Sequence, residues 1–150
     1  MMKKLLYCLL WLFVLLATAC SNLHPLHVEL HGSRYLNPDA QYHSLPVMVK
    51  VYQLKTRDAF DAATFSQLWR QSKSVLGDSL VTSVSARLQP GESKTVRMSK
   101  TNETKYVGVM AVYRQPSSQH WRIIRKIGRG IPYIPQNITV SLTGNHVYLK

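Results

Sequence analysis

Residues 106–113 read Tyr-Val-Gly-Val-Met-Ala-Val-Tyr, a stretch without a charged side chain. Its valines and tyrosines are residue types that favour strands. Apolar residues at successive positions, instead of every second one, indicate a strand that is covered on both faces. We therefore expect this segment to lie inside a sheet that packs against other elements on both sides.

On either side of this stretch, short segments alternate between apolar and polar residues, the pattern of strands with one buried face. Turn signals separate them, such as Gln-Pro-Gly-Glu at 89–92. The strands predicted in this way span residues 26–31, 47–52, 80–88, 94–98, 106–113, 120–127, 138–143 and 147–149. About eight strands at this spacing predict a mainly all-β chain folded as a two-sheet β-sandwich.

One segment has helical spacing instead. Apolar and small residues recur at i, i+3, i+4, i+7 and i+11, namely at Phe65, Leu68, Trp69, Ser72 and Leu76. This stripe predicts one amphipathic helix near residues 59–76, inserted after the second strand, with Trp69 packed on the core. Asp58 or Asp61 is expected to cap its start, and Gly77 to end it in the left-handed conformation.

The amino terminus has the parts of a secretory signal peptide. Lys3 and Lys4 precede an apolar run at 5–16 (LLYCLLWLFVLL), and small residues follow at 17–19. The run is shorter than the roughly 20 residues that a membrane-spanning helix needs. The alternative is a short membrane anchor or a buried core helix. We expect residues 1–19 to be removed.

Cys20 directly follows Ala17-Thr18-Ala19, and this stretch resembles a bacterial lipobox, although Ala17 stands where that pattern prefers Leu. The resemblance implies a diacylglyceryl group on the thiol of Cys20 and an acyl chain on its amine, and two or more chains anchor a protein firmly. Ser21 in second place implies the outer membrane. We expect a lipidated tether at 20–25 and a periplasmic domain at 26–150.

The charge balance is basic, with 19 Lys and Arg against seven Asp and Glu, a formal net charge of +12. Such a charge points to nucleic acid in an intracellular protein, but the signal peptide argues against that compartment. The sequence contains no G-x-S-x-G, H-E-x-x-H, phosphate-binding glycine loop or C-x-x-C. We therefore expect no enzyme, no small-molecule substrate and no cofactor apart from the covalent lipid.

Two groups of side chains, three histidines and a basic segment, each allow more than one functional interpretation. His24, His27 and His31 resemble metal ligands in type, but no carboxylate or cysteine is placed to complete a site, so we expect no metal. The basic segment from Arg122 to Arg129 has two interpretations. It is either an edge strand protected by its charges or a surface that attracts anionic headgroups or an acidic partner.

The longest irregular stretch is Gly32 to Pro46 (GSRYLNPDAQYHSLP), between the first two predicted strands. Loops of this length in compact domains are usually functional or disordered. This loop contains Arg and Tyr, which are enriched at protein interfaces. It is therefore the candidate binding surface.

The order of the motifs resembles the outer-membrane lipoprotein of bacterial type VI secretion systems, the TssJ-type family. The motifs are Leu-Asn-Pro-Asp at 36–39, Pro-Val-Met-Val-Lys-Val-Tyr-Gln-Leu at 46–54, Leu-Gly-Asp-Ser-Leu at 76–80, Leu-Gln-Pro-Gly-Glu at 88–92 and Tyr-Val-Gly-Val-Met-Ala-Val-Tyr-Arg at 106–114. The resemblance implies a transthyretin-like sandwich with an added helix. It also implies a role in fixing the secretion membrane complex to the outer membrane.

In that family the loop between the first two strands holds the periplasmic C-terminal region of the large inner-membrane component. The loop varies, so we select candidate contact residues by position and chemistry alone: Arg34, Tyr35, Leu36, Asn37, Asp39 and Tyr42. Two other hypotheses remain. One is a periplasmic lipoprotein that binds an envelope glycan or anionic polymer through the basic segment, and the other is a small periplasmic hydrolase.

Overall fold

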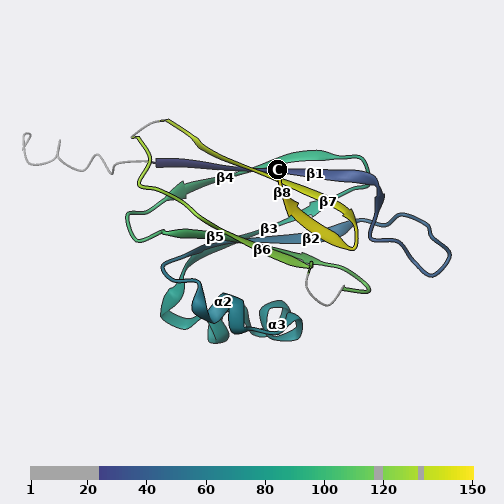
Figure 1. Cartoon of the computed structure of the whole chain (residues 1–150), viewed down its shortest axis with the longest axis horizontal. Helices are drawn as coiled ribbons and strands as arrows, with labels where there is room; N and C mark the ends of the chain where they lie inside the picture. The colour runs from purple at the N-terminus through teal and green to yellow at the C-terminus, as the bar shows by residue number, and fades with distance from the viewer. Residues whose placement is uncertain (1–23, 117–119, 132–133) are drawn as a thin grey trace, which may run out of the picture.

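The structure is a computed structural model that describes residues 24–116, 120–131 and 134–150. Two four-stranded sheets face each other (Figure 1). One sheet has the order β4-β1-β7-β8 and contains β1 (His24–Leu36), β4 (Ser93–Lys100), β7 (Gln136–Gly144) and β8 (His146–Leu149). The other has the order β3-β2-β5-β6 and contains β2 (Val47–Leu54), β3 (Leu80–Leu88), β5 (Tyr106–Val112) and β6 (Arg122–Lys126). The predicted mainly β, two-sheet sandwich is confirmed.

β5 has the central place that its sequence predicts, because it pairs with β2 on one side and β6 on the other. Its residues Val107, Val109 and Ala111 are buried with the core. On the opposite face, a Cβ atom at Gly108 would lie 2.8 Å from the ring of Phe60. The second sheet therefore covers one face of β5, and the helical layer covers the other.

β1 is longer than the alternation predicts. It begins at His24, paired with Lys100 of β4, and continues to Leu36, paired with Gly144 of β7. The prediction that the irregular loop begins at Gly32 is therefore wrong, and the loop between β1 and β2 spans residues 37–46. Pairing with a strand far along the chain extends β1 past the glycine, which a local pattern cannot reveal.

The helical segment is also divided differently. Two helices, α2 (Asp58–Ala62) and α3 (Phe65–Leu76), replace the single predicted helix, and a short η1 (Gly77–Ser79) follows. Figure 1 shows both helices on the outer side of the β3-β2-β5-β6 sheet. The break lies at Ala63 and Thr64, where the Thr64 side chain accepts from the backbone N–H of Gln67 and the Gln67 side chain accepts from Thr64 in return. This capping box starts α3 as a separate helix.

The predicted caps are corrected accordingly. Neither Asp58 nor Asp61 caps a helix start, since the N-cap of α2 is Arg57 and it makes no side-chain capping bond. Gly77 does end α3 with a positive φ of 47°, and its N–H donates to the carbonyl of Lys73, but its ψ of −130° lies outside the left-handed helical region.

The prediction that Trp69 packs on the core is wrong. Leu68 and Leu76 are buried, whereas Trp69 is 39% exposed. Gln71 interrupts the helix with non-helical angles (φ −134°, ψ 29°), so the regular stripe does not hold through α3. The ammonium of Lys50 lies 4.8 Å from the centroid of the Trp69 ring and donates to the Trp69 carbonyl at 3.0 Å. The indole therefore packs against β2 at the border of the helical layer.

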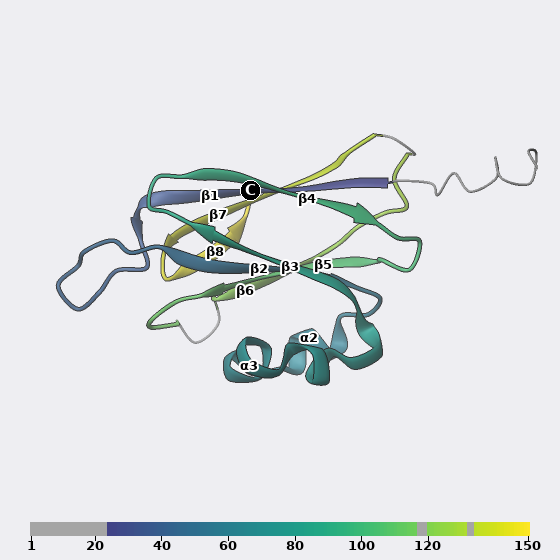
Figure 2. The same ribbon diagram turned by 180° about the vertical axis from the view of Figure 1, so that it is seen from behind.

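The sandwich has two distinct ends (Figures 1 and 2). At the N-terminal end, β1 begins at His24, next to the end of β4 at Lys100. At the loop end, β1 ends at Leu36 and the 37–46 loop follows. A strand of 13 residues separates these ends by about 40 Å, at about 3.3 Å per residue. No helix among the described residues is long and apolar enough to cross a membrane.

Candidate functional site

Asn37 closes the base of the 37–46 loop. Its side chain is 4% exposed, and its φ is 45°. The side-chain amide donates to the carbonyl of Pro46 at 2.8 Å, and the side-chain oxygen accepts from the backbone N–H of Arg114 at 2.9 Å. Its own backbone N–H donates to the carbonyl of Gly144 at 2.8 Å. One residue thus joins both ends of the loop to the strands beside it.

Asp39 organises the tip of the loop. One carboxylate oxygen accepts from the backbone N–H groups of Gln41, at 2.9 Å, and of His43, at 2.8 Å. The other oxygen lies 3.2 Å from Nδ1 of His43. The pKa of Asp39 is lowered, chiefly by the backbone N–H of His43, because such bonds favour the charged carboxylate. The tip is therefore a closed turn over residues 39–43.

The six predicted contact residues fall into two groups. Leu36 is fully buried in the core, and Asn37 and Asp39 use their side chains to shape the loop. By contrast, Tyr42 at the tip is 77% exposed, Tyr35 is 48% exposed, and Arg34 is also exposed. Of the six, only these last three leave their side chains exposed at the loop end, next to the exposed Ala40, Gln41 and His43.

The exposed residues of the β1 end are held by neighbouring turns. The aliphatic part of Arg34 lies against Gly91, and the Tyr35 ring lies against Gly144. Gly91 in turn donates its N–H to the carbonyl of Ser33 at 3.0 Å. The connections between β1 and β2, between β3 and β4 and between β7 and β8 therefore lie next to one another at the loop end.

A hollow of about 330 Å³ lies beside the loop, and sequence reasoning did not find it. Asn37, Leu45, Pro46, Val47, Met48, Arg87 and Arg114 line it. Its floor is apolar and it carries two guanidinium groups, neither in a salt bridge with another described residue. Met48 and Arg87 are register partners on β2 and β3. Only the strand pairing brings them together, so no local signal in the sequence could have done so.

The basic segment lies on an edge strand, as one of its two interpretations requires, since β6 is the last strand of its sheet. Arg122 has a further role there. Its guanidinium donates to the carbonyls of Phe60, of Ala63 at 2.6 Å and of Asp61 at 2.5 Å, and lies 4.6 Å from the Trp121 ring centroid. Burial lowers the pKa of Arg122. This side chain fastens α2 to the sheet and is not available to a ligand.

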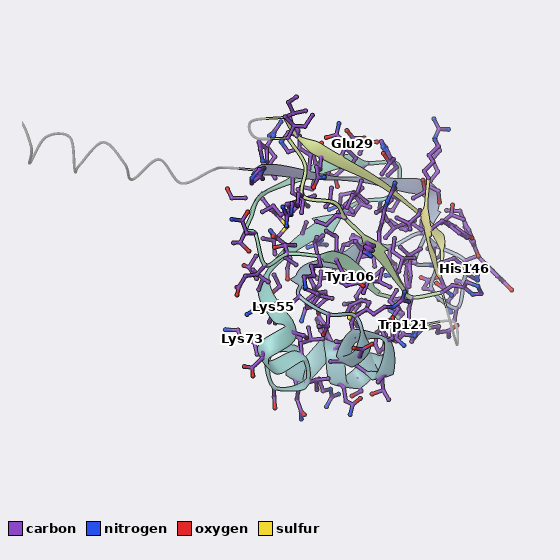
Figure 3. The ribbon with its side chains drawn as sticks, turned by 60° about the vertical axis from the view of Figure 1, so that its left-hand side comes forward. Glu29, Lys55, Lys73, Tyr106, Trp121 and His146 are labelled. Carbon is purple, nitrogen blue, oxygen red and sulfur yellow. The ribbon has the colours of Figure 1, made fainter. Side chains whose placement is uncertain are left out.

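Phe65 of α3 packs edge-on against Trp121, with ring centroids 5.2 Å apart, where the chain enters β6 beside the helices (Figure 3). The helical layer is thus held by an aromatic contact as well as by the Arg122 bonds. These contacts attach the helices to the edge of the sheet.

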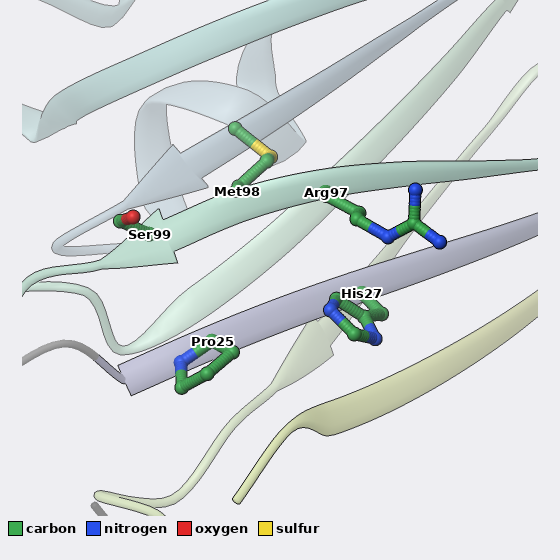
Figure 4. A pocket seen from close by; sticks show the side chains of 5 residues that line it. All are labelled: Pro25, His27, Arg97, Met98 and Ser99. Carbon is green, nitrogen blue, oxygen red and sulfur yellow. The ribbon is translucent and has the colours of Figure 1, made fainter. Parts of the chain in front are cut away.

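His27 and His31 lie on the outer face of β1, whereas His24 has the parity of the buried Leu26, Val28 and Leu30. Among the described residues, no group of three or more His, Cys, Asp or Glu side chains is arranged to hold a metal ion. His27 lines a shallow hollow with Pro25, Arg97, Met98 and Ser99 (Figure 4). His31 lies 2.8 Å from the hydroxyl of Ser93. Cys20, the predicted lipidation site, lies outside the described residues.

Residues 24–145 match the sequence profile of the T6SS-SciN family, described as "Type VI secretion lipoprotein, VasD, EvfM, TssJ". No curated protein matches the chain.

Solved structures with the same fold include a chain of "The Structure of Serratia marcescens Lip, a membrane bound component of the Type VI Secretion System" (22% identity, TM-score 0.79, covering 87% of this chain and 99% of that one). A chain of a structure described as "Type VI membrane complex" is 27% identical, with a TM-score of 0.76 and coverage of 85% and 98%. A chain of the structure described as "T6SS protein TssM C-terminal domain (869-1107) from EAEC" is 26% identical, with a TM-score of 0.72 and coverage of 84% and 97%.

Proposed function

Because the chain belongs to the type VI secretion lipoprotein family, we propose that it is a lipid-anchored adaptor without catalytic activity. Lipid on Cys20 holds it in the outer membrane. Its loop end holds the periplasmic C-terminal region of the large inner-membrane component of the secretion machine.

The observation that carries this proposal is the separation of the two ends of the sandwich. Only three residues, 21–23, separate Cys20 from the start of β1 at His24, and the four Cα–Cα steps between them span at most about 14 Å. A lipid on Cys20 therefore keeps the N-terminal end close to the membrane. The loop end lies about 40 Å from the anchored end, at about 3.3 Å per residue of β1, so that it can extend towards a partner that crosses the periplasm.

The construction of the loop supports a binding role. Asn37 at the base and Asp39 at the tip hold the loop in one shape, which reduces the entropy that a partner must remove on binding. The exposed side chains include Arg34, Tyr35 and Tyr42, of types enriched at interfaces. The adjacent hollow can accept an apolar side chain of the partner, and Arg87 and Arg114 can face its carboxylates.

The comparisons add support from the relatives. The structures that contain the similar chains are described as a type VI membrane complex and as the TssM C-terminal domain. We transfer this association to the present chain as part of the proposal. The loop residues that make the contact are assigned from their exposure here.

Affinity capture from detergent-solubilised envelopes tests the assignment. The tagged, lipidated protein is compared with the double variant Tyr35→Ala/Tyr42→Ala, which changes exposed side chains only, and with the matched control Arg97→Ala/Arg125→Ala away from the loop. We expect recovery of the large component to fall about tenfold or more with the loop variant, as for interface aromatics, and to stay unchanged with the control. If the loop variant recovered as much of the large component as the control variant, the proposed binding surface would be contradicted.

A further inference from the structure

The N-terminal end of the sandwich has a basic hollow with no assigned role. It has a volume of about 230 Å³ and is lined by Lys100, Asn102, Thr104, Lys105, Ile127, Gly128 and Arg129. We call it the basic hollow. It lies where β4 ends and where the chain leaves β6, next to the start of β1.

Lys100 builds the hollow but cannot bind a ligand directly. Its side chain is 4% exposed, and its ammonium donates to the carbonyls of Gly128 and Arg129 and, at 3.1 Å, to Oε1 of Gln136. These three acceptors use all three N–H bonds of an ammonium group. Lys100 therefore fixes the backbone at 128–129 and adds positive charge beneath the floor of the hollow.

Lys105 and Arg129 supply cations that a ligand can reach. Both are exposed, and neither forms a salt bridge within the described residues. Glu103, the carboxylate that lies in sequence between the lining residues Asn102 and Thr104, is already engaged with Lys55 at 3.2 Å. The hollow therefore has an excess of positive charge that nothing in the described part of the chain neutralises.

A further cation lies on the other side of the same strand end. Arg97 of β4 lines the shallow hollow with His27 and Ser99, as Figure 4 shows, and it too lacks a salt bridge to any described carboxylate. Odd-numbered residues of β4 point outward and Lys100 inward, by strand alternation. Both sides of this end of β4 thus present positive charge.

We propose that the basic hollow binds the phosphate of an anionic phospholipid headgroup in the leaflet that carries the lipid anchor. This inference depends on the proposed function, because the anchor on Cys20 brings the N-terminal end within about 14 Å of the headgroups. Lys105 and Arg129 hold the phosphate, and Asn102 can donate its side-chain amide. Tethering gives a high effective concentration, so two or three weak ionic contacts suffice. They orient the sandwich so that the loop end points away from the membrane.

The test uses the full lipidated protein in vesicles of phosphatidylcholine, or of an equal mixture of phosphatidylcholine and phosphatidylglycerol. Hydrogen–deuterium exchange is followed at residues 101–105 and 127–131. We expect slower exchange in the mixed vesicles only, reversed by high salt, which screens the contacts. Lys105→Gln/Arg129→Gln should abolish this protection, whereas the charge-matched control Arg87→Gln/Arg114→Gln at the loop end should retain it.

Three outcomes would overturn the inference. The exchange could be equal in the two kinds of vesicle, or the protection could persist in Lys105→Gln/Arg129→Gln. Inorganic phosphate added to phosphatidylcholine vesicles could also give the same protection, which would assign the hollow to a free anion. Flotation separates this inference from the proposed function: loss of flotation on phosphatidylcholine vesicles contradicts the lipid anchor, whereas flotation without protection contradicts headgroup binding alone.

Discussion

The side-chain amide of Asn37 donates a hydrogen bond to the carbonyl of Pro46, 2.8 Å away and nine residues along the chain, and so closes the loop between β1 and β2. The same side chain accepts from the backbone of Arg114. A short polar residue with positive φ at this point joins three separate segments. The base of the loop is therefore held in a defined conformation by the buried side-chain amide of Asn37.

Replacing Asn37 by Ala should destabilise the fold and weaken partner capture together. The change leaves the N–H of Arg114 and the carbonyl of Pro46 without their partner, which costs about 1–3 kcal/mol. Urea titration measures the loss in unfolding free energy. Asn37→Asp is the informative control, since it keeps the acceptor for Arg114 and loses the donor to Pro46. An unfolding free energy unchanged by Asn37→Ala would show that the amide does not support the loop.

The loop tip should open in acid. The pKa of Asp39 in the folded protein lies below its ordinary value of 3.8, chiefly because the backbone N–H of His43 donates to the carboxylate. The charged carboxylate therefore stabilises the folded protein fully at pH values above this ordinary pKa. The stabilisation is lost as the pH falls through the lower pKa that Asp39 has in the folded protein. Exchange at the His43 amide should therefore accelerate below about pH 4, after correction for the intrinsic rate.

Asp39→Asn is the control for the acid experiment. It removes the charge and keeps a neutral oxygen that can accept from the His43 amide, so exchange at that amide should show no acid transition. A transition that persists in Asp39→Asn would have to come from another group and would contradict the role given to this carboxylate.

Gly108 should tolerate no side chain. A Cβ at this position meets the Phe60 ring at 2.8 Å, so Gly108→Ala forces α2 away from β5, with a cost of about 1–3 kcal/mol, typical of overpacking. The double variant Gly108→Ala/Phe60→Leu removes the clash and should recover part of the loss in thermal stability. If Phe60→Leu lowers the thermal stability of Gly108→Ala further, the contact between Cβ of residue 108 and the Phe60 ring is not the cause of the destabilisation.

Arg122 should matter far more than its neighbour Arg125. Truncation to Ala removes the bonds to the carbonyls of Phe60, Asp61 and Ala63, and bonds to charged groups contribute about 1.5–3 kcal/mol. Arg125 is exposed on the same strand, so Arg125→Ala should change the unfolding free energy by less than about 0.5 kcal/mol. Similar values for the two variants would remove the argument that Arg122 holds α2.

The sequence predicts the sandwich well because strand alternation and the apolar stretch at 106–113 are local signals of burial. The prediction from sequence fails where the pairing of strands that are far apart in the chain determines the structure. β1 continues through Gly32 because β7 lies beside it, and Leu36 and Asn37 become buried for the same reason. The hollow between Met48 and Arg87 likewise depends on register.

The helix errors have a different origin. Thr64-Phe65-Ser66-Gln67 is a readable capping box, and it indicates the start of α3 after a break. The signal was therefore present in the sequence. The exposure of Trp69 was not predicted, because the stripe places it beside Leu68 and does not show which of the two the sheet covers.

Site-specific photocrosslinking in intact cells tests the central claim most directly, that one end of the sandwich faces the membrane and the other holds the partner. A photoreactive residue replaces Tyr42 at the loop tip in one strain and Asn102 at the N-terminal end in another; both positions are exposed. We predict an adduct with the large inner-membrane component from position 42 and none from position 102. An adduct with that component from position 102 and none from position 42 would contradict the account.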